Sequence, residues 1–322
     1  MDAISKLLNI ALPPLSLLLL TILMLPSLIF KLLMHVRKSL RKENVANKVV
    51  LITGAASGIG EQIAYEYARR GAKLSLVDIR NENLVAVSDK ARSLGSPDVT
   101  TIAADVSKVQ DCKRFVEETF NYFGRLDHLV NNAGIGGKKP VTVENMRDVS
   151  EYTAVMDVNF WGAVNATLFA IPHLKNSKGR IIVTSSVCGW FPLPLISIYN
   201  ASKAAITNFF ETLRMESGTA IGITIATPGF IKTDITLKAK FELKDVMRIV
   251  PLESASECAK AIVESACRGD MYVTYPSWYK MLFPWKVLHP QFVDWAVKLL
   301  CVPYLNKSAI KDNLMMPEYK VE

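Results

Sequence analysis

The chain has 322 residues, of which 50% are hydrophobic and 21% charged, with 16 glycines and 15 prolines. This composition excludes a disordered chain, a collagen-like repeat and a disulfide scaffold, and the length suits one large α/β domain with accessory segments. Of the formal charge of +8, residues 1–48 carry +5 and the rest only +3, so no nucleic-acid partner is expected. The five cysteines and four histidines are scattered without ligand spacing, which indicates reduced thiols and no metal site.

The N-terminal segment predicts a membrane anchor. Residues 7–30 contain no charge, and a straight helix of that length would span about 36 Å, enough for a hydrocarbon core of about 30 Å. The cationic cluster follows the apolar run, which favours a retained anchor over a cleaved signal peptide. Pro13, Pro14 and Pro26 interrupt the run, so a bent or re-entrant insertion stands beside a straight crossing as an open alternative.

The basic flank of this segment predicts its orientation. It consists of Lys31, Arg37, Lys38, Arg41 and Lys42. Such a flank stays on the cytosolic side and attracts anionic headgroups. We therefore expect residues 1–47 to form the anchor with its basic flank, and the domain behind them to face the cytosol.

Residues 48–275 alternate between strand and helix patterns. Strands are predicted at 48–53, 74–77, 99–103, 129–130, 180–184, 221–226 and 271–274. A helix follows the first strand up to Arg70, and further helices are predicted at 81–94, at 107–123 with Ser107 as its cap, after the fourth strand through about residue 175, at 198–216 and at 257–267. This alternation implies right-handed crossovers and a doubly wound parallel sheet of the Rossmann type, covered by helices on both faces.

The composition of the sequence changes after about residue 269, where aromatic residues and prolines become frequent. We expect residues 276–322 to form a small aromatic helical extension. Its apolar residues follow a spacing of three and four, as one helical stripe would: Trp285, Leu288, Phe292, Trp295 and Leu299. Packing onto the domain, cover for a sterol, membrane contact and a dimer contact are the alternatives for this stripe.

A glycine-rich turn separates the first strand from the first helix, with the sequence Gly54-Ala-Ala-Ser-Gly58-Ile-Gly60. Its spacing differs from the usual G-x-G-x-x-G, but strand, turn and helix occur in the required order. The free amides and the positive dipole at a helix N-terminus bind pyrophosphate. The turn therefore predicts a dinucleotide site formed by Gly54, Ser57, Gly58, Ile59 and Gly60.

Asp78 ends the second strand. A carboxylate at that place accepts both adenosine ribose hydroxyls and repels a 2′-phosphate, which favours NAD(H). Arg80, two residues further on, could instead reach a 2′-phosphate, so NADP(H) is the alternative.

Tyr199 and Lys203 form an i,i+4 pair, which shares one face of a helix. A phenol with a pKa near 10 is a poor base at neutral pH. A nearby ammonium and the positive nicotinamide of an oxidised cofactor would lower the pKa of Tyr199. Ser186 follows the fifth strand at the carboxyl edge, where ligands bind in open α/β sheets.

With these residues the chain resembles the short-chain dehydrogenase/reductase family over about residues 48–275. The motifs that carry the resemblance are Thr53-Gly-x-x-x-Gly-x-Gly60, Asp105, Asn131-Asn-Ala-Gly134, Asn159, Ser186, Tyr199-x-x-x-Lys203 and Pro228-Gly229 through Thr233. The proline-bearing anchor, the run Phe160-Trp161-Gly162 and the aromatic C-terminus are similar to plant steroleosins, the 11β-hydroxysteroid dehydrogenase-like proteins of oil bodies.

The resemblance implies a role for each site residue. Tyr199 exchanges the hydroxyl proton, Lys203 binds the nicotinamide ribose, Ser186 binds the substrate oxygen and Asn159 holds a relay water. Asp105 and Asn131 are expected near adenine, and Thr233 near the nicotinamide carboxamide. The remaining cofactor contacts implied are Val106, Asn132, Ala133, Gly134, Pro228 and Ile231.

We therefore expect a membrane-anchored NAD(P)-dependent oxidoreductase of the endoplasmic reticulum or of lipid droplets. It would transfer hydride between the cofactor and a hydrophobic alcohol or ketone, foremost a steroid or sterol. The alternatives are another lipid alcohol, or a structural lipid-droplet protein with vestigial catalysis, and a homodimer is an open alternative as well. Thr236, Phe241, Met247 and Ile249 either line the substrate pocket or pack a lid.

Overall fold

The computed structural model describes residues 2–40, 42–137, 149–237 and 251–299, and the chain divides into two compact units, 1–43 and 44–322. The first unit contains α1 (Asp2–Leu40), which runs as one helix through Pro13, Pro14 and Pro26. The Ser16 hydroxyl donates to the Pro13 carbonyl at 2.8 Å and Thr21 donates to the Leu18 carbonyl at 2.8 Å, so these hydroxyls are satisfied within the helix.

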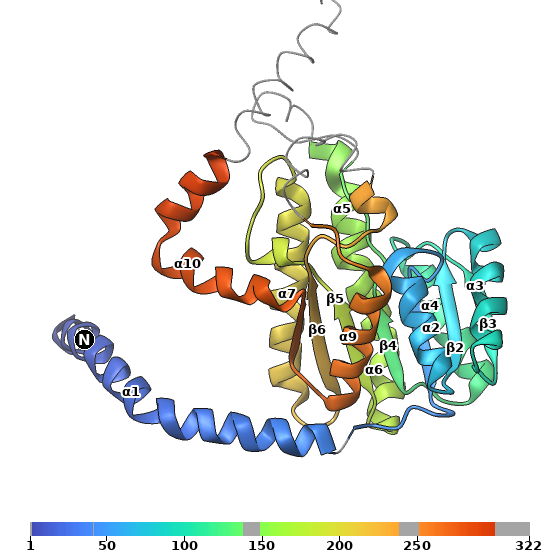
Figure 1. Ribbon diagram of the computed structural model, residues 1–322, viewed down its shortest axis with the longest axis horizontal. Coiled ribbons are helices and arrows are strands. Elements are labelled where there is room, and N and C mark those ends of the chain that lie inside the picture. Colours follow the sequence, from blue (N-terminus) through green and yellow to red (C-terminus); the bar gives the residue numbers. More distant parts are fainter. Residues whose placement is uncertain (1, 41, 138–148, 238–250, 300–322) are drawn as a thin grey trace, which may run out of the picture. The chain divides into compact units, whose positions relative to one another are not determined.

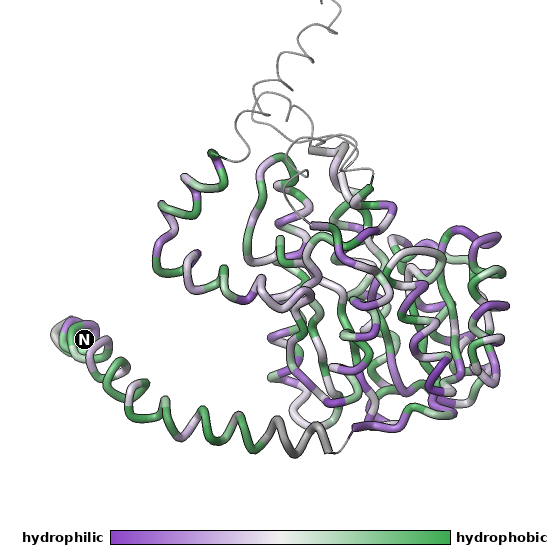
Figure 2. The backbone as a smooth tube through the Cα atoms, in the orientation of Figure 1, coloured by the Kyte–Doolittle hydropathy of each residue, from purple (hydrophilic) through white to green (hydrophobic). Residues whose placement is uncertain are grey.

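The helix α1 is apolar along most of its length (Figure 2). Its stretch Ile4–Phe30, of 27 residues, is long and apolar enough to cross a membrane, and none of its most apolar window is buried inside the protein. A helix of that length rises about 40 Å. Large exposed apolar side chains are costly in water, so this surface is a candidate for contact with an apolar environment.

The second unit is built on a parallel sheet, which has seven strands among the described residues, in the order β3-β2-β1-β4-β5-β6-β7 (Figure 1). The strands are β1 (Val49–Thr53), β2 (Lys73–Asp78), β3 (Val99–Ala103), β4 (His128–Asn131), β5 (Arg180–Thr184), β6 (Gly222–Pro228) and β7 (Tyr272–Tyr275). The order reverses between β1 and β4. In such sheets the crevice beyond the carboxyl ends of these strands binds ligands.

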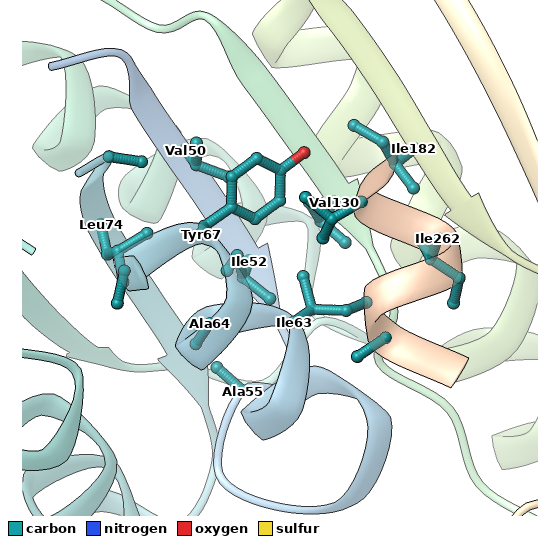
Figure 3. Close-up of a cluster of buried hydrophobic side chains, with 14 of the residues drawn as sticks. Val50, Ile52, Ala55, Ile63, Ala64, Tyr67, Leu74, Val130, Ile182 and Ile262 are labelled. Carbon is teal, nitrogen blue, oxygen red and sulfur yellow. The ribbon is translucent and has the colours of Figure 1, made fainter. Parts of the chain in front are cut away.

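Helices cover both faces of the sheet. One layer consists of α2 (Gly58–Arg69), α3 (Asn81–Ser93) and α9 (Ala255–Arg268), and the other of α4 (Val109–Phe123), α6 (Gly162–Ser177) and α7 (Ser197–Ser217). Figure 3 shows Tyr67 and Ile63 of α2 in one buried cluster with Ile262 of α9 and the sheet residues Val50 and Val130. Burial on both faces explains why the strands are continuous apolar runs rather than alternating ones.

The predicted Rossmann-type fold is confirmed, but one expectation for its helices is wrong. Ser107 does not cap a helix, because α4 begins at Val109 and the Ser107 hydroxyl donates to Asp105 at 2.7 Å instead. The helices expected up to about residue 175 are confirmed, and the part before α6 is divided into short pieces. It consists of η1 (Val149–Tyr152), α5 (Thr153–Met156) and the π-helical turn η2 (Asp157–Trp161).

The C-terminal extension continues from β7 through η5 (Ser277–Met281) and α10 (Leu282–Leu288) to a helical piece at 290–299. The single stripe expected here is wrong, because the helix breaks at His289. Pro290 follows, which disfavours helical backbone at His289 and removes an amide donor. The side chains of the stripe are 52–70% exposed, so they do not pack onto the domain: Trp285, Leu288, Phe292, Trp295 and Leu299.

Candidate active site

The glycine-rich turn has the geometry that a bound pyrophosphate needs. Gly58 has a φ of +59°, in the region that favours glycine, and a Cβ on Gly60 would lie 2.1 Å from the Gly54 carbonyl oxygen. Ser57, at the N-cap of α2, makes no side-chain hydrogen bond to the helix. The first amides of α2, which include that of Ile59, are therefore not capped by Ser57 and can bind an anion. This cradle fits a dinucleotide.

The motif after β4 holds this turn in place. The side-chain amide of Asn132 donates to the carbonyls of Thr53 and Gly54 at 3.2 Å each. In return the Thr53 hydroxyl accepts the amides of Asn132 at 3.1 Å and Ala133 at 3.2 Å. Thr53 is part of the sequence motif, but its clamping role emerges only from these contacts.

The other two residues of the motif, Asn131 and Gly134, lie against different parts of the domain. The side chain of Asn131 is buried and donates to the hydroxyl of Thr167 in α6 at 2.8 Å, so it fastens β4 to that helix. Gly134 lies at the opposite side of the motif. A Cβ there would approach Asn159 Oδ1 to 3.3 Å and Lys203 Nζ to 3.5 Å, so the motif links the nucleotide turn to the helices that carry the reacting groups.

Asp78 is only 6% exposed and its carboxylate is already engaged. One oxygen accepts the Ala56 amide at 3.1 Å, and the other accepts the backbone amide and the Nε of Arg80, each at 3.1 Å. The Arg80 guanidinium also donates to the Ser57 hydroxyl at 2.8 Å and lies 3.6 Å from Asp234. The expected ribose site thus contains a carboxylate and a guanidinium side by side.

The segments after β3 and β6 begin at the carboxyl edge of the sheet, where the glycine-rich turn also lies. Asp105 accepts the Ser107 amide at 3.0 Å, and Val106 packs where a Cβ of Gly162 would lie 3.0 Å away. The methyl group of Thr233 lies 3.1 Å from the position of a Cβ on Gly58. The structure therefore gathers Asp105, Val106 and Thr233 around the sheet edge that carries the turn.

The segment that begins at Gly229 is held by its own hydroxyls. Ile231 is buried, and its carbonyl accepts a hydrogen bond from Thr236. Thr233 and Thr236 share a second hydrogen bond of 2.8 Å. Thr236 thus stabilises the segment, whereas Phe241, Met247 and Ile249 lie outside the described residues.

The reacting groups meet at the carboxyl edge of β5 and β6. Ser186 follows β5 and begins the turn η3 (Val187–Gly189), where its hydroxyl accepts the Cys188 amide at 3.1 Å. The same hydroxyl contacts the carbonyl of Pro228, the last residue of β6, at 3.4 Å. On α7, Lys203 Nζ lies 5.7 Å from the centre of the Tyr199 ring and donates to the Thr184 carbonyl at 3.0 Å.

Burial dominates the ionisation of the Tyr199–Lys203 pair. It raises the pKa of Tyr199 above its ordinary value, and a hydrogen bond with the Ser186 side chain opposes that rise. Burial also lowers the pKa of Lys203 to about 8. The expected lowering of the Tyr199 pKa invokes both Lys203 and an oxidised cofactor, and it stays a prediction; in the protein alone the Lys203 ammonium donates to a backbone carbonyl. A cationic nicotinamide would supply the missing positive charge.

Asn159 lies in the π-helical turn, and both polar atoms of its side chain are hydrogen-bonded. Its Oδ1 accepts the Ile135 amide at 2.8 Å, and its Nδ2 donates to the Ile135 carbonyl and to the Ser202 hydroxyl at 3.0 Å each. The Ser202 hydroxyl in turn donates to the Tyr199 carbonyl at 2.8 Å. Ser202 was not singled out in the sequence, where its only signal is its place just before Lys203.

A glycine-rich turn at the topological switch point, beside a Ser-Tyr-Lys cluster at the carboxyl edge, defines an NAD(P)-dependent oxidoreductase that acts on a CH–OH group. Comparison with known proteins makes the assignment specific. The chain belongs to the short-chain dehydrogenase family, whose profile, described as short chain dehydrogenase, matches residues 48–243.

Curated plant relatives match almost the whole chain. The chain is 47% identical over 311 residues to "11-beta-hydroxysteroid dehydrogenase A" of Sesamum indicum, covering 93% of this chain and 88% of the relative. It is 49% identical over 305 residues to "11-beta-hydroxysteroid dehydrogenase-like 2" of Arabidopsis thaliana, covering 95% and 98%. Both extend beyond the family profile into the terminal segments.

The fold has a counterpart among solved structures. A short chain dehydrogenase/reductase from Burkholderia phymatum in complex with NAD superposes with a TM-score of 0.66 at 26% identity, covering 74% of this chain and 92% of that chain. A nicotinamide cofactor in this neighbour agrees with the cradle that the glycine-rich turn forms here.

Proposed function

We propose that this protein is a membrane-anchored enzyme that oxidises a hydrophobic secondary alcohol or reduces the corresponding ketone, with a steroid or sterol as substrate. The meeting of Ser186, Tyr199 and Lys203 at the carboxyl edge of β5 and β6 carries the proposal. The names of the plant relatives support the steroid class.

Each of these side chains has a distinct task. Ser186 donates a hydrogen bond to the substrate oxygen, in place of its long contact with the Pro228 carbonyl. Tyr199 takes the hydroxyl proton during oxidation and returns it during reduction. Lys203 holds positive charge beneath the phenol ring and binds the nicotinamide ribose. A bound nicotinamide supplies the hydride chemistry at the carbinol carbon.

Asn159 and Ser202 position these groups rather than react. The Asn159 side chain ties Ile135 to α7 through Ser202. Its side-chain amide is thereby occupied, so we assign the relay water to the backbone carbonyl that the π-helical turn presents. In π-helical geometry the carbonyls are displaced from the regular ladder, a feature frequent at functional sites.

The cofactor preference follows from the Asp78–Arg80 pair. Asp78 favours the two ribose hydroxyls of NAD(H) and disfavours a 2′-phosphate. Arg80 weakens that discrimination because its guanidinium already neutralises the carboxylate and reaches Ser57. We therefore assign NAD(H) as the preferred cofactor and NADP(H) as a slower alternative.

Two surfaces support attachment to a lipid surface. The apolar stretch of α1 provides the anchor. The C-terminal extension exposes aromatic side chains that are typical of membrane interfaces, among them Trp285, Phe292 and Trp295. The basic flank of the apolar stretch supports a domain on the cytosolic side of the endoplasmic reticulum or of a lipid droplet.

One experiment tests the catalytic proposal. The full chain in detergent micelles, as wild type and as Tyr199→Phe, is offered steroids and long-chain alcohols with NAD and NADP separately. We expect steroid turnover by the wild type and a loss of at least about a thousandfold in the variant, with cofactor binding retained. Turnover of long-chain alcohols alone would assign another lipid substrate. Cofactor binding without any turnover would favour a structural lipid-droplet protein.

Orientation has its own test. Asn306 lies in the formal glycosylation sequence Asn-Lys-Ser, outside the described residues. A cytosolic domain leaves it unmodified, whereas a glycosidase-sensitive mass shift that disappears in Asn306→Gln would place the domain in the lumen.

A further inference from the structure

The segment after β7 turns back onto the loop that follows β6. Tyr279, in η5, is only 6% exposed, and its ring lies against Gly229, where a Cβ would approach the ring to 2.2 Å. Gly229 directly follows Pro228, whose carbonyl the Ser186 hydroxyl contacts. Tyr279 thus contacts the residue next to the one that Ser186 contacts, close to the expected site of the substrate oxygen.

The same segment is also attached to the loop that follows β5. The rings of Phe283 and Trp190 meet edge to face with their centres 5.7 Å apart, and Lys286 donates to the Trp190 carbonyl. Trp190 comes directly after η3, the turn that Ser186 begins. The segment therefore contacts both loops that follow the carboxyl ends of β5 and β6.

The hydroxyl of Tyr279 is a buried polar group whose hydrogen bonding the described part of the protein does not satisfy. Within the described residues its oxygen has no hydrogen bond of normal geometry. Burial raises the pKa of Tyr279 to about 12, against a smaller opposing effect of the Phe230 amide. Cys188 lies close enough to Tyr279, Tyr199 and Lys203 to contribute to the pKa of each, so Tyr279 lies in the neighbourhood of the Tyr199–Lys203 pair.

Buried hydroxyls in folded proteins nearly always have partners, and a ligand can provide one. We infer that residues 277–288 form a wall of the alcohol site and that the Tyr279 hydroxyl binds a second oxygen of the substrate, away from the reacting carbinol. This inference rests on the proposed oxidoreductase function. It narrows the substrate class to hydrophobic alcohols that carry a further oxygen group, and it assigns Tyr279 as a specificity-determining residue.

The test compares matched substrates with the full chain in detergent micelles. The probes are a steroid mono-alcohol and a series of otherwise identical keto-alcohols with the ketone at successive ring positions, assayed in the oxidative direction so that the ketone is inert. We expect at least one keto-alcohol to exceed the mono-alcohol in kcat/KM with the wild type. Tyr279→Phe should reduce that advantage about five- to tenfold, mainly through KM, while the mono-alcohol is unaffected.

Two further variants complete the design. Tyr122→Phe removes an exposed hydroxyl on α4 and should change neither substrate. Gly229→Ala places a methyl group where the Tyr279 ring lies, so it should displace the ring and reproduce the loss of selectivity. An unchanged ratio of kcat/KM values in Tyr279→Phe would overturn the inference but leave the oxidoreductase intact. Cofactor binding without turnover of any probe by the wild type would remove the proposed function, and the inference with it.

Discussion

Asn159 and Ser202 are 43 residues apart in the chain, yet the side-chain amide of Asn159 donates to the Ser202 hydroxyl at 3.0 Å. This bond joins the π-helical turn before α6 to the helix that carries Tyr199 and Lys203. Because Ser202 also donates to the Tyr199 carbonyl, one hydroxyl fixes both elements. The position of Tyr199, the proposed reacting phenol, therefore depends on Ser202 as well as on its own helix.

Ser202→Ala tests this dependence. The change leaves the buried Asn159 amide with one acceptor fewer, which costs about 1–3 kcal/mol of unfolding free energy. We expect kcat to fall about tenfold, because the Tyr199 hydroxyl is no longer held in its position. The dissociation constant for NADH should be unchanged.

The matched control is Thr212→Ala on the same helix, where the hydroxyl is exposed and bonds only to the Asn208 carbonyl. It should leave kcat and stability near those of the wild type. Equal kcat values for Ser202→Ala and the wild type would show that the bond is dispensable for catalysis.

Gly60→Ala tests the dinucleotide cradle. The new Cβ would lie 2.1 Å from the Gly54 carbonyl oxygen, so the turn must shift away from the start of α2. We expect the affinity for NADH, measured by the quenching of tryptophan fluorescence, to fall by at least about a hundredfold.

Gly124→Ala is the control for the backbone effect of such a change. Gly124 has a φ of +73° but no atom within 4 Å of a Cβ, so the change strains the helix end without crowding any neighbour. It should cost about 1 kcal/mol of stability and leave NADH binding intact. Similar NADH affinities for the two variants would contradict a role for the turn in cofactor binding.

Arg80→Ala tests how the enzyme distinguishes its cofactors. The guanidinium is the cation placed beside Asp78 and Ser57, where a 2′-phosphate would lie. Since charge-assisted hydrogen bonds contribute about 1.5–3 kcal/mol, kcat/KM with NADP should fall at least about tenfold, and kcat/KM with NAD should change little. Arg92→Ala, which removes an exposed guanidinium from α3, should leave both values unchanged. A parallel loss with both cofactors would show that Arg80 supports the fold of the site rather than its selectivity.

The sequence predicts the nucleotide half of the site better than the reacting half. Strand, turn and helix in order suffice for Gly58 and Gly60, because backbone geometry alone demands glycine there. The clamp from Asn132 to Gly54 spans 78 residues and depends on which strands are neighbours in the sheet. No local pattern contains that information.

The remaining differences are tertiary effects that local spacing does not encode. The π-helical turn at Asn159 follows from contacts with Ile135 and α7, which override the helical pattern. The apolar stripe from Trp285 to Leu299 has helical spacing, but Pro290 splits it into two pieces. The pKa of Tyr199 depends on burial, a quantity that an i,i+4 spacing does not give.

Lys203 gives the site a measurable dependence of stability on pH. Burial lowers its pKa to about 8 from the ordinary 10.5. Between these values the unfolded chain binds a proton that the folded chain has released. Unfolding therefore takes up a proton, and raising the pH through this interval stabilises the folded state. The contribution is about 3 kcal/mol across the interval.

Lys203→Met isolates this contribution, because the other titrating groups are common to both proteins. We expect the wild type to gain stability relative to Lys203→Met as the pH rises from 8 to about 10.5, in urea unfolding of the full chain in detergent micelles. Lys113→Met, at an exposed position on α4, should follow the wild type across the series. A stability difference that stays constant with pH would mean that Lys203 is protonated in the fold as readily as in the unfolded chain. Its ammonium would then be stabilised by contacts stronger than the single bond to the Thr184 carbonyl.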